Sequence, residues 1–191
     1  MSLSDRQTTG KDIHGWDLDG IAKKKARKRR GSIAYRKVQD HYKNHIHWCI
    51  NRVNLKGIKE LRLEEIVNIN YKRRTSRYLQ GFANSLVRDT IKARCEENGV
   101  HFKLQSSSYR SQRCSQCGWV QKSNRKGKVF SCNQCGYVDD ADINASLNHE
   151  ANLPDVPVWL RKAKVNRAGF YWLVTGFVDK FGVELRVPLS R

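Results

Sequence analysis

Two cysteine pairs constrain the fold of this chain more than any other feature. The segments C-S-Q-C-G (residues 114–118) and C-N-Q-C-G (residues 132–136) repeat one pattern, with 14 residues between the two pairs. In each segment the glycine permits a tight turn that directs both sulfur atoms to one point. Four thiolates so placed are typical of a zinc ribbon with a β-hairpin between the pairs. A redox dithiol pair and an iron–sulfur cluster are the alternatives, and the two glycine-backed turns with their polar hairpin favour zinc.

The predicted zinc ligands are Cys114, Cys117, Cys132 and Cys135. These four thiolates fill a tetrahedral site completely, which predicts a structural zinc ion with no open position for catalysis. The remaining cysteines, Cys49 and Cys95, lie on apolar faces of expected helices, so we interpret them as core residues.

The charge of the chain indicates a polyanionic partner. The 191 residues include 37 Lys and Arg against 18 Asp and Glu, for a formal net charge of +19. Nucleic acid is the most common partner of such a surface, and DNA or RNA is therefore expected. The mean hydropathy is −0.72, no apolar run is long enough for a membrane span, and no signal peptide is visible. The sequence predicts no membrane association and a cytoplasmic protein whose cysteines are reduced unless a metal binds them.

Two basic segments are candidates for contact with phosphates. The first is the run at residues 23–30, for which a solvated arm is the alternative. Its candidate residues are Lys23, Lys24, Lys25, Arg27, Lys28, Arg29 and Arg30. The second is the ribbon, where cations are interleaved with an aromatic residue that can stack on a base. Its candidate residues are Trp119, Lys122, Arg125, Lys126 and Lys128. Phe130 is expected to fill the small core of the ribbon.

Hydrophobic periodicity predicts an α/β arrangement before the ribbon. A helix is expected from the N-cap Ser32 to Gly57, and its histidines are interpreted as solvated or phosphate-facing rather than as metal ligands. A strand over 58–69, a second helix ending at Asn98-Gly99 and a strand over 100–105 follow. The apolar stripe of the second helix is expected at Leu79, Phe82, Leu86, Thr90 and Ala93. After the ribbon, a helix over 142–153 and C-terminal strands are expected, with Trp159 and Trp172 as packing residues.

Acidic residues gather at two element boundaries of this basic chain. Glu64 and Glu65 end the first expected strand, and Asp139, Asp140 and Asp142 follow the ribbon. Nucleases that use two Mg²⁺ ions bind them with several carboxylates from separate elements. Surface charge at the edge of a zinc module is the alternative explanation of these acids.

The segment from Ser108 to His149, with its cysteine pairs followed at once by D-I-N-A, resembles the C-terminal region of transposon-encoded TnpB (OrfB-type) proteins. These proteins are related to the RNA-guided type V CRISPR nucleases. The segment "LRLEEI" at residues 61–66 also resembles the family, and the likeness covers most of residues 4–150.

The resemblance implies a RuvC-like nuclease domain of RNase H fold with an inserted zinc ribbon. It also implies that Asp142 is the last catalytic carboxylate and that Glu64 is another, with Glu65 as second choice. Mg²⁺ as catalytic cofactor, Zn²⁺ as structural cofactor, DNA as substrate and a guide RNA as partner of the full-length family are implied in the same way.

The chain departs from the family at its beginning. Family members begin this domain with a strand that ends in the first catalytic Asp, and no such strand precedes Asp17 or Asp19 here. The sequence therefore predicts an incomplete domain, as a fragment, a truncated gene product or one part of a split protein, inactive alone.

The expected organisation has three parts. Residues 1–105 form the RuvC-like part with its basic arm and long helices, residues 106–138 the ribbon, and residues 139–191 the last RuvC-like motif with C-terminal strands. The function expected first is a TnpB-like RuvC-type DNA endonuclease region, associated with transposition. A non-catalytic zinc-ribbon protein that binds DNA or RNA is the alternative, and a zinc-stabilised interaction protein is a third hypothesis.

Overall fold

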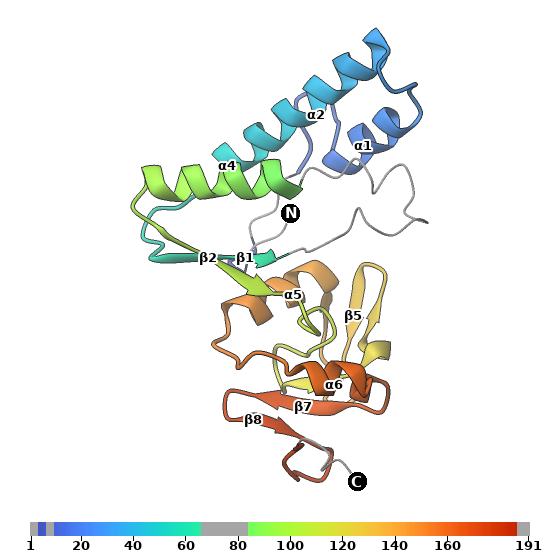
Figure 1. Ribbon diagram of the computed structural model, residues 1–191, viewed down its shortest axis with the longest axis vertical. Helices are drawn as coiled ribbons and strands as arrows, with labels where there is room; N and C mark the ends of the chain where they lie inside the picture. Colours follow the sequence, from blue (N-terminus) through green and yellow to red (C-terminus); the bar gives the residue numbers. More distant parts are fainter. Residues whose placement is uncertain (1–3, 7–9, 66–83, 187–191) are drawn as a thin grey trace. The chain divides into compact units, whose positions relative to one another are not determined.

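The computed structural model describes residues 4–6, 10–65 and 84–186, which belong to two compact units (Figure 1). The N-terminal unit is formed by residues 8–104, and the C-terminal unit by residues 1–7 and 105–191. Each unit has a hydrophobic core of its own. No helix in the described part of the chain combines the length and the apolar character that a membrane span needs.

The N-terminal unit contains helices that pack on one another and a two-stranded sheet. Its elements are α1 (Leu18–Ala26), α2 (Ile33–Asn51), β1 (Glu60–Glu65), α4 (Asn84–Glu97) and β2 (His101–Ser106). The sheet pairs β1 with β2, whose last residues belong to the C-terminal unit. The expected order of helix, strand, helix and strand is therefore present after residue 32.

Capping residues determine where the first two helices begin. Ser32 precedes α2 and its hydroxyl accepts a hydrogen bond from the amide of Tyr35 at 3.1 Å, as the sequence predicted. Asp17 caps α1 in the same way through the amide of Gly20, at 2.7 Å. Helix α1 was not predicted, and α2 ends at Asn51, before the expected Gly57.

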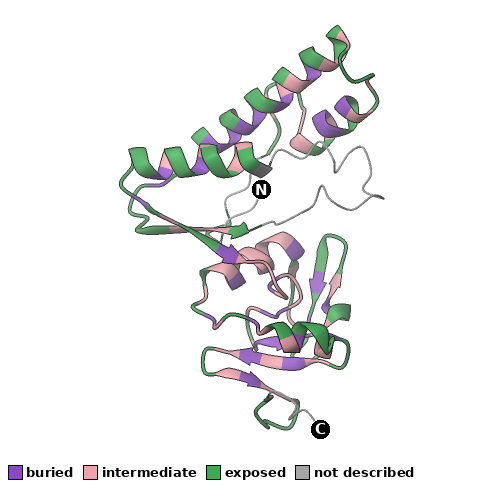
Figure 2. Cartoon of the chain, viewed as in Figure 1, coloured by how far each residue is buried: buried purple, intermediate pink, exposed green. Residues whose placement is uncertain are grey.

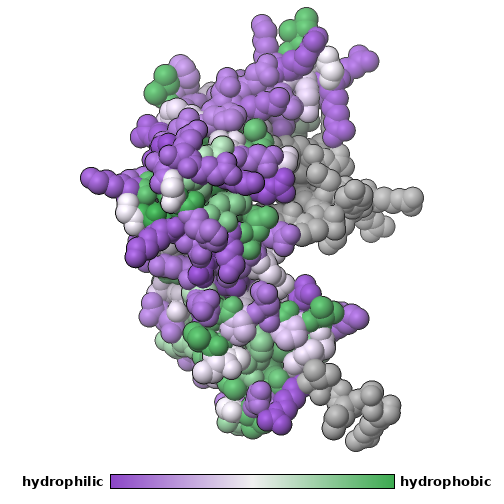
Figure 3. Space-filling view, turned by 60° about the vertical axis from the view of Figure 1, so that its left-hand side comes forward, coloured by the Kyte–Doolittle hydropathy of each residue, from purple (hydrophilic) through white to green (hydrophobic). Residues whose placement is uncertain are grey.

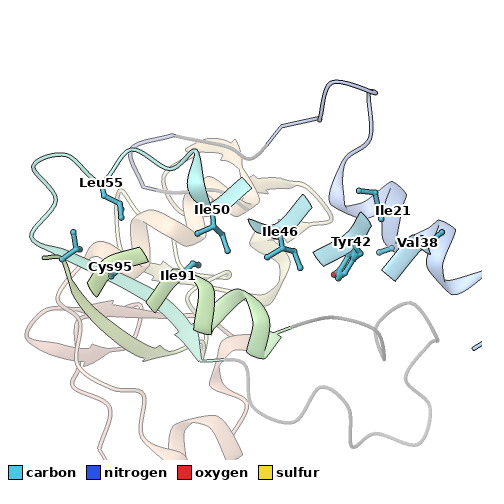
Figure 4. Close-up of a cluster of buried hydrophobic side chains, with 10 residues drawn as sticks. Ile21, Val38, Tyr42, Ile46, Ile50, Leu55, Ile91 and Cys95 are labelled. Carbon is cyan, nitrogen blue, oxygen red and sulfur yellow. The ribbon is translucent and has the colours of Figure 1, made fainter. Parts of the chain in front are cut away.

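The core of the N-terminal unit lies between α2 and its neighbours. Tyr42, Ile46 and Ile50 recur every four residues along α2, which places them on one side of the helix (Figures 2 and 4). From α4, Ile91 and Cys95 join the same cluster. The predicted stripe on the second helix was wrong in its detail, because Ala93 is exposed. Leu79 and Phe82 lie outside the described residues.

The three histidines of α2 have different environments. His45 is buried and stacks on Trp48, so the prediction of a solvated or phosphate-facing side chain was wrong for this residue. Asp12 lies against it and also accepts a hydrogen bond from His41 at 3.2 Å, while His47 is exposed. Burial lowers the pKa of His45, which favours its neutral form.

The C-terminal unit combines the cysteine module with short strands and helices. Its elements up to the long helix are β3 (Trp119–Val120), η2 (Lys122–Asn124), β4 (Arg125–Lys126), β5 (Val129–Ser131), β6 (Val138–Asp140) and α5 (Ala141–Glu150). The elements that follow are α6 (Val158–Lys162), η3 (Val165–Arg167), β7 (Phe170–Leu173) and β8 (Gly176–Val178). Two antiparallel sheets result, with strand orders β4-β5-β6 and β3-β7-β8.

The expectations for this unit are largely confirmed. A hairpin connects the cysteine pairs, a helix follows the ribbon, and Trp172 is buried as a packing residue. The second expected C-terminal strand is reduced to one bridge between Val178 and Glu184 in the described part. The mixed α/β fold class with a four-cysteine module is confirmed.

Candidate metal centre and nucleic-acid interface

The two cysteine pairs adopt nearly the same backbone geometry. In each pair the first cysteine's carbonyl accepts a hydrogen bond from the glycine amide at 3.0 Å, at Gly118 and at Gly136. Both glycines have positive φ, 81° and 76°, a region that other residues occupy only with strain. The first cysteine's amide in turn donates to the residue after the glycine, at 2.8 Å in both pairs. The repeated C-x-x-C-G pattern of the sequence therefore forms the same backbone turn at both cysteine pairs.

The four sulfur atoms converge as a tetrahedral metal site requires. Cys114 and Cys135 have their Sγ atoms 3.7 Å apart, and Cys117 and Cys132 3.6 Å apart. A zinc ion with Zn–S bonds of about 2.3 Å separates tetrahedral sulfur ligands by roughly 3.8 Å. All four sulfurs lie within 4.8 Å of one another, and no other such group of Cys, His, Asp or Glu occurs within residues 4–6, 10–65 and 84–186. The cluster is compatible with a metal such as zinc.

Metal binding by the cluster would require loss of the thiol protons. Burial raises the pKa of Cys114 to about 11 and also raises the pKa of Cys117, with nearby sulfur charge adding to the effect. A divalent metal ion removes these protons by binding the thiolates. A zinc ion bound by four thiolates has a net charge of −2. The buried guanidinium of Arg113 lies beside Cys114, where it donates a hydrogen bond to the Cys114 carbonyl.

Two buried asparagines fasten α5 to the first cysteine pair. Asn144 accepts a hydrogen bond from the amide of Ser115 at 3.0 Å and donates to the carbonyl of Arg113 at 2.8 Å. One turn later, Asn148 accepts from the guanidinium of Arg113 at 2.6 Å and donates to the carbonyl of Arg110 at 3.0 Å. Both side chains are fully buried, so the helix and the metal module share one hydrogen-bond network. Neither residue was predicted from the sequence, although asparagines four residues apart on a helix were a visible signal.

The acids before α5 have structural partners. Asp140 is the N-cap of α5, and its carboxylate accepts hydrogen bonds from the amides of Asp142 and Ile143 at 2.8 and 3.1 Å. Asp139 accepts from the hydroxyl of Tyr137 at 2.5 Å and from Arg6 at 3.0 Å. These contacts explain two of the three aspartates without any catalytic role.

Asp142 is held differently, by two cations of the ribbon hairpin. Arg125 lies 2.8 Å from one carboxylate oxygen and Lys128 lies 2.6 Å from the other. Partial burial acts to raise the pKa of Asp142, but hydrogen bonds and charge from Lys128 and Arg125 outweigh burial and lower that pKa. The amide of Ala141 also donates to the carbonyl of Lys128 at 2.8 Å, which holds the start of α5 beside the hairpin (Figure 1).

The second proposed carboxylate, Glu64, belongs to the N-terminal unit. It lies in β1 near the end of the strand, and its side chain is exposed, as is that of Glu65. Asp17 caps α1, and Asp19 forms an ion pair with Lys23 at 2.6 Å. Both of these aspartates therefore have roles at the start of a helix, and neither ends a strand.

The basic residues of the ribbon are mostly accessible. Lys122, Lys126 and Lys128 are exposed, and Arg125 is half-buried against Asp142. Trp119 is only 4% exposed and packs edge-on against Tyr171. The prediction that Trp119 contacts nucleic acid is therefore wrong in this structure, because its ring is occupied by the ribbon core. Phe130 is buried there, as expected.

The basic run at residues 23–30 is an ordered connection between helices. Lys23, Lys24 and Lys25 lie in the last turn of α1, and the remaining residues form the turn that leads to α2. Lys25 is only 5% exposed, with its ammonium group 3.9 Å from the ring centroid of Tyr42, so it is not available to phosphates. The remaining accessible candidates are Lys23, Lys24, Arg27, Arg29 and Arg30, with Lys28 half-buried. Hydrophilic side chains cover most of the visible face of the N-terminal unit (Figure 3).

The comparison with protein families places part of this chain in a known group. Residues 85–149 match the family described as the Cas12f1-like TNB domain. This match includes α4, β2, all four clustered cysteines and Asp142.

Individual proteins give consistent results. The chain is 36% identical over 93 residues to the CRISPR-associated endodeoxyribonuclease Cas12f1 of Sulfoacidibacillus thermotolerans, covering 48% of this chain and 22% of that protein. It is 32% identical over 77 residues to the putative transposase A625R of Paramecium bursaria Chlorella virus 1, covering 40% of this chain and 18% of that protein. The chain thus spans only about a fifth of the length of these relatives.

A solved structure of a Cas12f1–sgRNA–target DNA complex has 20% sequence identity to the chain and a TM-score of 0.48. The region that superposes covers 61% of this chain and 35% of the Cas12f1 chain. The resemblance noted in the sequence is confirmed to this extent: residues 85–149 match the Cas12f1-like TNB domain, and parts of the chain are similar to a Cas12f1 nuclease and to a putative transposase.

Proposed function

We propose that this chain is a nucleic-acid-binding region of a TnpB-like RuvC-type DNA endonuclease. In this proposal residues 106–138 are a zinc ribbon that binds nucleic acid, and residues 1–105 and 139–191 contribute to a RuvC-like, RNase H-type domain. DNA is the proposed substrate and a guide RNA the proposed partner. The relationship to the Cas12f1 and transposase sequences supports the proposal.

The observation that supports it best is the position of Asp142. The carboxylate lies in the first turn of α5, directly after the ribbon, with a lowered pKa that keeps it ionised at neutral pH. Arg125 and Lys128 lie on its two oxygens, so a carboxylate for metal and two cations for phosphate are adjacent. Zinc ligation by the four cysteines would fix the hairpin that positions these cations.

Asp142 is the proposed Mg²⁺ ligand of the C-terminal unit, and Glu64 is proposed separately as a catalytic carboxylate of the N-terminal unit. Carboxylate oxygens suit Mg²⁺, which when bound would activate water and stabilise the leaving oxygen of a phosphodiester. The role of Asp142 requires that its ion pairs open, because both oxygens are occupied by cations. A phosphate that binds Arg125 and Lys128 would release the carboxylate. A further acid is also required for a two-metal site, and neither Asp17 nor Asp19 is placed to supply it.

Mn²⁺ binding, measured by electron paramagnetic resonance in the presence of a short DNA duplex, tests this role directly. Asp142→Asn is expected to weaken Mn²⁺ binding about tenfold or more, since it removes the charge that attracts the ion. Lys128→Gln is expected to strengthen it severalfold, because a competing cation is removed. Lys122→Gln is the matched control, with the same loss of charge in the ribbon and no ion pair with Asp142.

Equal Mn²⁺ affinity in the wild-type protein and in Asp142→Asn would contradict the proposal. Strong Mg²⁺-dependent cleavage of DNA that persists in Asp142→Asn would contradict it as well.

A non-catalytic nucleic-acid-binding function is the second candidate, and one observation favours it. The two ribbon cations neutralise Asp142, as they would if the aspartate only stabilised the hairpin. This function requires salt-dependent binding of DNA or RNA. It also requires that neither Asp142→Asn nor Lys128→Gln changes the affinity for Mn²⁺.

A further inference from the structure

We propose that the segment from α6 to η3, residues 158–167, is a second surface that binds the phosphate backbone of nucleic acid. This segment lies beyond the family match, which ends at residue 149. The proposal rests on the proposed nucleic-acid-binding function, and it assigns a separate part of the chain to that function.

The part of the chain after residue 149, called the C-terminal extension below, pairs with the ribbon. Strand β7 pairs with β3 of the ribbon, with Trp119 opposite Tyr171 and Val120 opposite Phe170. The amide of Trp172 donates to the carbonyl of Gly118 at 2.9 Å, and the carbonyl of Trp172 accepts from Arg113 at 2.8 Å. The extension therefore has a fixed position relative to the first cysteine pair.

Close packing reinforces this attachment at Gly169. A Cβ atom at this residue would lie 2.1 Å from the ring of Trp119, and φ is +98°, so only glycine fits. Leu160 of α6 is fully buried in the same core as Phe170 and Trp172. One side of α6 is thus held against the sheet, which leaves its polar side facing solvent.

The charged residues of this segment are all basic and all exposed. Arg161, Lys162, Lys164 and Arg167 are all exposed, and the sequence has no Asp or Glu between Asp155 and Asp179. In the described part of the chain, none of these four cations has an ion pair with a carboxylate, whereas Arg125 and Lys128 of the ribbon do. Within seven residues, four cations without a carboxylate partner among the described residues are a strong electrostatic site for phosphates, although Arg161 also donates a hydrogen bond to the hydroxyl of Ser108 at 3.4 Å.

The backbone at Lys164 adds an independent observation. Lys164 joins α6 to η3 with φ 52° and ψ 35°, the left-handed conformation. Glycine or asparagine is preferred at such a position after a helix, and a lysine is strained there. Strained residues concentrate where function requires a particular side chain. A lysine therefore occupies a position where glycine would suit the fold better.

A nucleic-acid strand fits this surface better than a lipid or a protein does. The cations lie on a short helix and the turn after it, and the core beneath them includes β7, which pairs with the ribbon strand β3, where nucleic-acid binding is already proposed. Phosphate contacts of this kind are independent of base sequence and sensitive to salt.

The test is fluorescence anisotropy of the full chain with a short labelled DNA duplex over a range of salt concentrations. The triple variant Lys162→Gln/Lys164→Gly/Arg167→Gln is expected to bind roughly tenfold more weakly, with a salt slope smaller by about 2 to 3. Lys164→Gly alone is expected to weaken binding while its melting temperature is unchanged or higher, which separates binding from folding. Lys180→Gln in the same extension is the matched control and is expected to bind like the wild-type protein.

Wild-type affinity and salt slope in the triple variant would overturn this inference and leave the proposed function intact. If the wild-type chain binds no DNA or RNA, the proposed function fails together with the inference. A triple variant that keeps its DNA affinity but no longer binds vesicles of phosphatidylserine and phosphatidylcholine would assign the surface to membranes, which also overturns the inference.

Discussion

At the scale of single residues, the side chains that matter most are the buried amides of α5. Asn144 and Asn148 satisfy backbone groups of Arg113, Ser115 and Arg110, and their own side chains are fully buried. A buried polar group that loses its partner is costly, because it gave up its hydration when the protein folded. These asparagines therefore determine where Asp142 lies, although neither is a candidate for contact with substrate.

The first prediction concerns this network. Asn148→Ala is expected to lower the free energy of unfolding of the C-terminal unit by about 2 to 4 kcal/mol, because several buried hydrogen bonds are lost together. Chemical denaturation followed by tryptophan fluorescence measures this change. Asn133→Ala, at an exposed asparagine of the ribbon, is the control and is expected to cost within about 0.5 kcal/mol. Equal effects of the two substitutions would show that the network does not stabilise the unit.

The second prediction is a pH dependence that originates at His149. Burial, with a smaller contribution from the charge of Arg110, lowers the pKa of His149 to about 4, and the side-chain amide of Gln105 lies 3.2 Å from Nδ1. Between the ordinary pKa of about 6.5 and this value, the unfolded chain binds a proton that the folded chain does not. Stability is therefore full above about pH 6.5 and falls as the pH is lowered toward 4.

Thermal unfolding across this pH range measures the effect. The loss attributable to His149 is expected to be on the order of 2 kcal/mol. His149→Gln is expected to flatten the profile, whereas His47→Gln, at an exposed histidine of the other unit, leaves it unchanged. A wild-type profile that is already flat between pH 6.5 and 4 would contradict this account.

At the scale of elements, the cysteine turns organise the short strands around them. The strands from β3 to β6 contain only two or three residues each, too few to be stable on their own. Their geometry depends on the metal module, on the pairing of β3 with β7 and on the hydrogen bonds to α5. Loss of the metal should therefore affect the helix as well as the ribbon.

The third prediction is one zinc ion per chain, bound by the four cysteines. Elemental analysis is expected to find it in the wild-type protein and in Cys49→Ala, but not in Cys114→Ala/Cys132→Ala. Cobalt substitution is expected to give the absorption of a tetrahedral thiolate site. Chelation is expected to lower the melting temperature of the C-terminal unit, because metal binding contributes to folding. Zinc retained in the double cysteine variant would contradict the assignment.

The sequence was most informative where the chemistry depends on spacing along the chain. The cysteine turns, the N-cap at Ser32 and the helix after the ribbon are local patterns, and the structure reproduces each of them. Helix α1 was missed because its last turn is a run of lysines, which concealed the cap at Asp17.

Burial of polar and aromatic side chains was less predictable. Lys25 and Trp119 were expected to contact nucleic acid, yet each packs against a residue that is distant in sequence, Tyr42 and Tyr171 respectively. The same limit applies to Asp142. Its place after the ribbon could be predicted, but its ion pairs with Arg125 and Lys128 follow from the pairing of β5 with β6.

At the scale of the whole molecule, the net charge of +19 is the dominant property. Exposed cations occur at the connection between α1 and α2, on the ribbon and on the segment from α6 to η3. A chain that contacts nucleic acid at several such surfaces releases many counterions when it binds. Binding should therefore be strong at low salt and should weaken steeply as salt is added.

The most direct test of the central claim, that the metal-bound ribbon belongs to a nucleic-acid-binding region, is the affinity for DNA as a function of salt. The measurement compares zinc-loaded protein with protein from which zinc has been removed. The loaded protein is expected to show a slope of log K against log salt of at least about 4 in magnitude, and zinc removal is expected to weaken binding about tenfold or more. A slope near zero, or the same affinity with and without zinc, would contradict the claim.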